Sequence, residues 1–181
     1  MILTMDIGNT NVKYGVFDGD ELVASWRVST KASRTADEYG MVLYDLLKQR
    51  GVNFEDIDAC VMSSVAPALN YTIEHMCRYY IGKAPLIVSS KTDTGIKLAY
   101  AHPTQLGTDR IVGAAAAYHL YGGPVIVVDF GSATTFNLVT KDGVYIGGAI
   151  APGIKTATES LVTTAAKLPR IELEKPQNIV G

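Results

Sequence analysis

A short pattern occurs twice in this chain and constrains its fold more than any other feature: an apolar run, an aspartate, one further residue and a glycine. The first copy reads I-L-T-M-D-I-G-N-T-N and the second V-I-V-V-D-F-G-S-A-T. Asp129 and Gly131 thus take the places of Asp6 and Gly8, about 120 residues further on. Such a repeat predicts two domains of like topology. If the two turns face each other, they can bind one polyphosphate across a cleft.

The first copy combines a strand-end carboxylate with a small polar turn. Gly8 lacks a Cβ, so a ligand can approach its backbone, and the turn amides can point at an anion. Thr10 and Asn11 add side-chain donors. The Asp6 carboxylate repels phosphate and needs a metal ion or a water between them. This combination indicates metal-bound nucleotide phosphates, and the alternative is an ordinary β-hairpin with a polar turn.

The first half of the chain alternates strand and helix patterns. Parallel strands joined by crossover helices bind ligands at the carboxyl ends of the strands. We expect the order β-β-β-α-β-α-β, with strands at 2–6, 12–17, 21–28, 57–65 and 85–89 and helices at 36–50 and 67–81.

The second half opens with the longest irregular stretch, residues 91–108, and long loops in compact domains are often functional. Thr108 is expected to be the N-cap of a helix that runs from Asp109 to Tyr121. The second copy of the opening unit then follows, with strands at 124–129, 134–139 and 144–150, and a helix runs from Gly153 through about Leu168. A second domain equal to the first needs further αβ units, so the chain looks incomplete at its C-terminus.

Composition excludes several classes of partner. Of the 181 residues 48% are hydrophobic and the net charge is −2, without a Lys/Arg cluster, which argues against nucleic acid or an anionic membrane as the main partner. No apolar run approaches the roughly 20 residues of a membrane span. The N-terminus lacks a basic region, so we expect no signal peptide. Cys60 and Cys77 form no C-x-x-C motif, which fits a reducing cytosol.

Three motifs in this order carry a family resemblance: D-I-G-N-T-N near the start, G-T-D-R at 107–110 and D-F-G-S-A-T-T at 129–135, with Tyr100-x-x-Pro103 ahead of the second. Together they resemble the type III pantothenate kinases of the acetate kinase, sugar kinase, Hsp70 and actin superfamily. The resemblance implies an α/β fold of two similar ribonuclease H-like (actin-like ATPase) domains around a cleft. The expected division is 1–118 and 119–181, with the second domain truncated at its C-terminus.

The resemblance also implies an activity and a set of site residues. The family phosphorylates pantothenate with ATP, in the first step of coenzyme A biosynthesis. Asp109 matches the catalytic base, Asp129 the ligand of a monovalent cation (K⁺ or NH₄⁺), and Asp6 lies near the Mg²⁺. A cytoplasmic homodimer is implied, with the substrate pocket close to the partner subunit. Matching pantothenate-binding residues are Tyr100, Gly107, Thr108, Asp109 and Arg110, and matching ATP-binding residues are Asp6, Ile7, Gly8, Asn9, Thr10, Asn11, Val12, Lys13 and Ser132.

The residues themselves support two interpretations at each of these positions. Asp109, in the first turn of a helix, can be a base held ionised by the helix dipole or a simple charge complement to that dipole. Arg110 beside it can bind a substrate carboxylate through two hydrogen bonds. Asp129 can ligate a cation or cap its turn. Tyr100 can stack on a substrate or pack on the domain edge.

Two other functions compete with the kinase. A kinase-like regulatory accessory protein keeps the fold and binds a partner without turnover, but should lose Asp109 or the acid–glycine turns, and both are present. A conformational machine of the actin or Hsp70 kind needs large insertions, and the connections here are short. The resemblance implies a further substrate motif after Gly181 that is absent here, so this chain is either a fragment of the enzyme or given without its remainder, and its activity by itself stays open.

Overall fold

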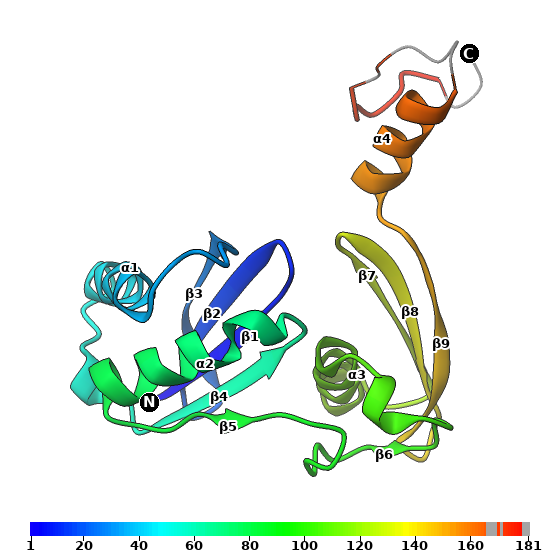
Figure 1. Ribbon diagram of the computed structural model, residues 1–181. Helices are drawn as coiled ribbons and strands as arrows, with labels where there is room; N and C mark the ends of the chain where they lie inside the picture. Colours follow the sequence, from blue (N-terminus) through cyan, green and yellow to red (C-terminus); the bar gives the residue numbers. More distant parts are fainter. Residues whose placement is uncertain (166–169, 171, 179–181) are drawn as a thin grey trace.

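The computed structural model describes residues 1–165, 170 and 172–178, which form two β-sheets with helices packed on them. The first sheet has the strand order β3-β2-β1-β4-β5, and the second has the order β6-β9-β8-β7. Helices α1 (Ala36–Lys48) and α2 (Pro67–Met76) pack together beside the first sheet, and α3 (Thr108–Tyr121) lies between the two sheets (Figure 1).

The first sheet has the predicted order of elements. Strands β1, β2 and β3 form an antiparallel meander, and β4 and β5 add in parallel on the other side of β1. The parallel strands are reached through α1 and α2, as crossover connections require. Their bounds are β1 Ile2–Ile7, β2 Asn11–Asp18, β3 Glu21–Ser29, β4 Ala59–Ser64 and β5 Leu86–Ile87.

Side-chain alternation in β1 gives this sheet one apolar and one polar face. Leu3, Met5 and Ile7 are almost fully buried in the core that contains the buried residues of α1 and α2. Because successive side chains point to opposite faces, Thr4 and Asp6 lie on the face away from this core. The β1 sequence therefore delivers the Asp6 carboxylate to the face on which α3 touches β4.

The second sheet repeats the antiparallel meander of the first. β7 (Val125–Phe130), β8 (Ala133–Val139) and β9 (Val144–Pro152) pair in sequence order, and β6 (Lys97–Leu98) joins β9 in parallel. Helix α3 packs on β7 and β8 and also contacts β4 of the first sheet. Its residues Ile111 and Ala114 share a small core with the second sheet.

Several expected boundaries differ from the structure. Thr108 is wrong as the N-cap, which is Gly107, because the Thr108 hydroxyl bonds to β4 instead of its own helix. The helix expected at 67–81 becomes a π-helix over Cys77–Ile81, and the irregular stretch 91–108 contains β6 and a 3₁₀ turn at Pro103–Gln105. Helix α4 is described over Ile154–Thr164, and its expected extension to Leu168 lies outside the described residues.

The division after residue 118 falls inside α3, and it stays a prediction. None of the helices in the described part of the chain combines the length and apolar character needed to cross a membrane.

Two helical glycines test the packing of the first domain. A Cβ on Gly40 in α1 would lie 2.6 Å from the Tyr80 ring, whereas a Cβ on Gly113 in α3 would meet no atom of the described residues within 4 Å. We expect Gly40→Ala to destabilise the protein by about 1–3 kcal/mol through overpacking. The control Gly113→Ala should stabilise by about 0.5–1 kcal/mol because alanine favours the helix. Urea denaturation measures both, and a Gly40→Ala variant as stable as the Gly113→Ala variant contradicts the packing.

Candidate active site

The two acid–glycine turns meet in the folded chain. The hydroxyl groups of Thr10 and Ser132, from the β1–β2 and β7–β8 turns, are 2.7 Å apart. In each turn the glycine amide donates to a carbonyl across the turn, from Gly8 to Asn11 at 2.9 Å and from Gly131 to Ala133 at 3.0 Å. The two turns of the sequence repeat therefore touch each other through their side chains.

The glycine of the first turn serves the turn itself. A Cβ on Gly8 would lie 2.9 Å from the Asn11 carbonyl oxygen, and its amide already donates to that oxygen. The Gly8 amide was expected to be available to a ligand, but its hydrogen is already used in a bond within the turn. Ile7 and Val12 are fully buried in the first core, so only their backbones can contact a nucleotide. Asn9, Thr10 and Lys13 are exposed at the turn or beside it.

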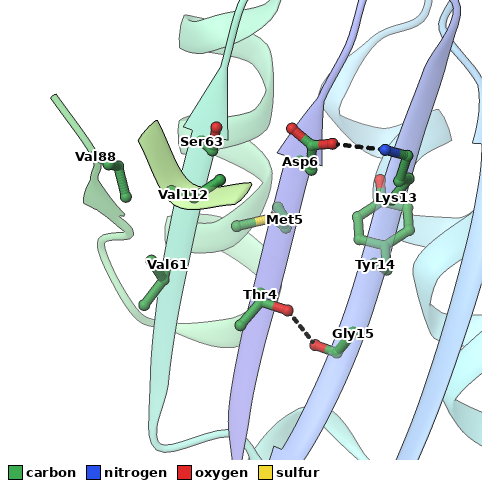
Figure 2. Close-up of a pocket in the computed structure, with 10 residues that line it drawn as sticks. All are labelled: Thr4, Met5, Asp6, Lys13, Tyr14, Gly15, Val61, Ser63, Val88 and Val112. Carbon is green, nitrogen blue, oxygen red and sulfur yellow. Dashed lines mark hydrogen bonds and ion pairs between the residues drawn. The ribbon is translucent and has the colours of Figure 1, made fainter. Parts of the chain in front are cut away.

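Asp6 lies at one end of a pocket of about 400 Å³ on the open face of the first sheet (Figure 2). Its Oδ2 accepts from Lys13 Nζ at 3.0 Å, and the two residues are direct cross-strand neighbours. Its Oδ1 is buried and has no hydrogen-bond partner among the residues that the structure describes. An unpaired buried oxygen is costly, so this atom is suited to an incoming cation or donor. Apolar side chains that line the pocket include Val61, Val88 and Val112.

Thr108 joins the start of α3 to the end of β4. Its hydroxyl donates to the Ser64 carbonyl at 3.0 Å and accepts from the Ser64 amide and the Ser63 hydroxyl, each at 3.1 Å. Sequence reasoning did not assign these two serines to the site. The available signal was their position, a polar pair at the end of a buried strand. The predicted contact between Thr108 and substrate stays a prediction.

Asp109 occupies the first turn of α3 and is half-buried. A Cβ on Gly107 would lie 2.5 Å from Asp109 Oδ1, so glycine leaves the room that this carboxylate occupies. Burial raises the pKa of Asp109, and the negative charges of Asp6 and Asp129 raise it further. The Arg110 amide, which donates to Oδ1 at 2.8 Å, lowers this pKa, as does the Arg110 charge.

Burial has the largest influence on the pKa of Asp109 and outweighs the groups that favour its charged form. The expected role of the helix dipole in holding Asp109 ionised stays a prediction. Asp6 and Asp129, from the two turns of the repeat, thus both influence the Asp109 carboxyl. Asp129 itself is exposed at the end of β7.

Arg110 points from α3 to the second sheet. Its Nε donates to Asn137 Oδ1 at 2.6 Å, and its Nη2 donates to the Phe136 carbonyl at 3.3 Å. Asn137 was not predicted, because an asparagine inside an apolar strand gives no sign of its partner. Tyr100 is 38% exposed. It follows Ala99, whose amide donates to the Tyr145 carbonyl at 2.9 Å, and the Tyr145 hydroxyl bonds to the same Asn137 oxygen as Arg110. The segment before Tyr100 and the Arg110 side chain thus both contact the second sheet.

The raised pKa of Asp109 gives a stability prediction. Folding favours its protonated form, so this contribution is fully present below the unfolded pKa and is lost as pH rises through the folded pKa. At neutral pH the charged carboxylate is thus destabilising. We expect Asp109→Asn to melt at a higher temperature than the wild type at neutral pH. The difference should shrink as pH falls toward about 4, where unfolded aspartate protonates.

Thermal melts from pH 4 to 8 measure this difference. The control is Asp20→Asn, in the exposed β2–β3 turn, where no such gain is expected. If Asp109→Asn melts at or below the wild-type temperature at neutral pH, the charged Asp109 carboxylate does not destabilise the fold.

Solved structures confirm the fold class. A Campylobacter jejuni protein assigned to the Baf family of transcriptional activators gives a TM-score of 0.56 at 20% identity, covering 97% of this chain and 68% of that one. An activator of 2-hydroxyisocaproyl-CoA dehydratase from Clostridium difficile, with bound ADPNP, gives a TM-score of 0.53 at 18% identity, covering 83% of this chain and 45% of that one. At these identities the likeness concerns the actin-like ATPase fold alone.

The relatives found by sequence share a much higher identity with this chain than these solved structures do. The type III pantothenate kinase of Brevibacillus brevis is 51% identical over all 181 residues, which span 71% of its length. Those of Geobacillus kaustophilus and Agathobacter rectalis are each 49% identical, with 70% of their length covered. A family model described as type III pantothenate kinase matches residues 2–181. This chain therefore belongs to the type III pantothenate kinase family.

Proposed function

We propose that this protein transfers the γ-phosphoryl group of ATP to the hydroxyl of pantothenate, the first step of coenzyme A biosynthesis. Relatives that are about 50% identical over the whole chain are named type III pantothenate kinases. The observation that carries the proposal is the position of Asp109, near the acids of both turns and half-buried at the start of α3. Phosphoryl transfer needs such positioning and charge neutralisation more than covalent chemistry.

The two turns are the proposed binding site for the ATP phosphates. They contact each other through Thr10 and Ser132, so a polyphosphate that binds there can touch both sheets. Both hydroxyl groups can donate to phosphate oxygens if the hydrogen bond between Thr10 and Ser132 breaks. Lys13 supplies a positive charge beside Asp6. These contacts would position the terminal phosphate above the pocket that Asp6 borders.

Asp109 is the proposed general base. It accepts the proton of the attacking hydroxyl, a group that is a poor nucleophile while protonated. A carboxyl whose pKa is raised is a stronger base when ionised, and Asp109 has such a pKa because of its burial. Its Oδ1 is held by the Arg110 amide at 2.8 Å, so the carboxylate has a fixed orientation. General-base help contributes roughly 10²–10⁴-fold to such reactions.

Mg²⁺ fits the site as an ion that arrives with the phosphates. Such ions are usually bound by one or two carboxylates together with phosphate oxygens. The partnerless Oδ1 of Asp6 offers one carboxylate ligand, and the described residues contain no cluster of three His, Cys, Asp or Glu that could hold a metal without the nucleotide. The ion would neutralise charge on the transferring phosphate. Asp129, exposed at the second turn, is the proposed oxygen ligand of K⁺ or NH₄⁺.

The substrate side of the proposed site is formed by Tyr100 and Arg110. The guanidinium can pair with the pantothenate carboxylate, and the half-exposed ring of Tyr100 can cover the substrate. We further propose a cytoplasmic homodimer, as the family resemblance implies. The two described cysteines are buried free thiols, which fits a reducing compartment. The regulatory alternative is not favoured, because the relatives are named kinases.

Replacing the base tests the proposed activity. We expect Asp109→Asn to lower pantothenate-dependent ADP release by at least about 100-fold, because amide cannot accept the proton. ATP binding, measured by calorimetry, should change little. Asp20→Asn, remote from the site, is the control with wild-type turnover. A turnover of Asp109→Asn within a few fold of the wild type would remove Asp109 from the mechanism.

The proposed cation ligand has its own test. Asp129→Asn removes a negative charge that favours a monovalent cation, so half-maximal activity should require a higher KCl concentration. Turnover is measured against KCl at constant ionic strength, with tetramethylammonium chloride as the balancing salt. If Asp129→Asn and the wild type have the same KCl dependence, Asp129 does not hold the cation.

A further inference from the structure

Asn137 is a buried polar residue whose hydrogen bonds lead to the substrate side of the site. It lies on β8 with only 2% of its surface exposed. Burial of an amide is unfavourable unless its polar atoms are paired. Its Oδ1 accepts from Arg110 Nε at 2.6 Å and from the Tyr145 hydroxyl at 2.9 Å, and its Nδ2 donates to Thr135 at 3.3 Å. Arg110 is thus one of two donors to the same buried oxygen, and the Asn137 amide joins it to Tyr145.

The orientation of this amide is fixed by its partner. An arginine Nε can only donate, so the Asn137 atom that faces it must be the oxygen. Tyr145 is fully buried, and burial raises the pKa of its hydroxyl, which therefore stays protonated and donates. Both donors bond to the same oxygen, and this oxygen fixes the position of the Arg110 Nε atom.

A second contact fixes the plane of the guanidinium group. Arg110 Nη2 donates to the Phe136 carbonyl at 3.3 Å, so Nε and Nη2 both bond to β8. On β9, a Cβ at Gly148 would lie 2.7 Å from Nη2, so glycine leaves space for the group. Among the described residues no acceptor takes a hydrogen bond from Nη1. The edge formed by Nη1 and Nη2 is the one left to receive a ligand.

We propose that Asn137 is a positioning residue, which holds Arg110 so that its free edge pairs with the substrate carboxylate and so sets the preference for an anionic substrate. This inference rests on the proposed function. Two-point pairing of arginine with a carboxylate depends on the direction of the guanidinium plane. Without the Asn137 oxygen the Arg110 side chain can adopt other rotamers, so its pairing with the substrate carboxylate weakens. Proton transfer to Asp109 continues.

The test uses the full protein and two substrates that differ in charge. Pantothenate carries a carboxylate, and pantothenol carries a neutral CH₂OH group in its place. Asn137→Leu removes the acceptor at similar volume, and it should raise the KM for pantothenate by about 10- to 100-fold, the usual effect of losing a hydrogen bond to a charged group. Its kcat should stay within a few fold of the wild type, and its KM for pantothenol should hardly change.

Two further variants separate positioning from general damage. Asn137→Asp keeps an oxygen acceptor for Arg110, so it should restore most of the preference for pantothenate. Tyr145→Phe removes only a hydroxyl from the same oxygen, and it should lower the preference in the same direction. It serves as the test if Asn137→Leu does not fold, as judged by thermal melting.

These assays distinguish a failure of the positioning role of Asn137 from a failure of the proposed kinase function. Equal losses for both substrates, or an unchanged preference in Asn137→Leu and Tyr145→Phe, overturn the positioning role while the kinase stands. A wild-type protein that phosphorylates neither substrate contradicts the proposed function, and the inference falls with it.

Discussion

The first turn of α3 is held from both sides, and the candidate site depends on this link. On one side the Thr108 hydroxyl makes three hydrogen bonds to the end of β4. On the other side Arg110 bonds to Asn137 and to the backbone of β8. Asp109 stands between these two anchors. Its position relative to both sheets is therefore set by hydrogen bonds from its immediate neighbours, and a side chain held this way loses little freedom when a substrate arrives.

The electrostatic arrangement around Asp109 opposes folding and favours ligand binding. Asp6 and Asp129 both repel its negative charge, and burial removes it from water. Lys13 pairs with one oxygen of Asp6, and the other oxygen has no partner in the described part of the chain. Cations that bind with a nucleotide would relieve this repulsion, because they are attracted by the same charges. Active sites commonly carry such unfavourable charge, which the rest of the fold has to offset.

Local patterns predicted most of the first domain. The order β-β-β-α-β-α-β expected for the first half of the chain is the order of strands and α-helices that the structure has. The errors arose where a distant partner outweighs local preference. Thr108 has the chemistry of an N-cap, but its hydroxyl bonds to β4. The two-residue strand β6 exists only because β9 lies beside it, so no local pattern could reveal it.

The repeat, the two acid–glycine turns and the family can be identified from residue order, because they consist of short motifs and strand–turn–strand units. The hydrogen bonds of Thr10 with Ser132 and of Asn137 with Arg110, pairs separated by 122 and 27 positions, could be found only in the folded chain. A hydrogen bond between elements requires a separation near 3 Å and a suitable angle. Those follow from how the helix and sheets pack, and not from the identity of the two residues.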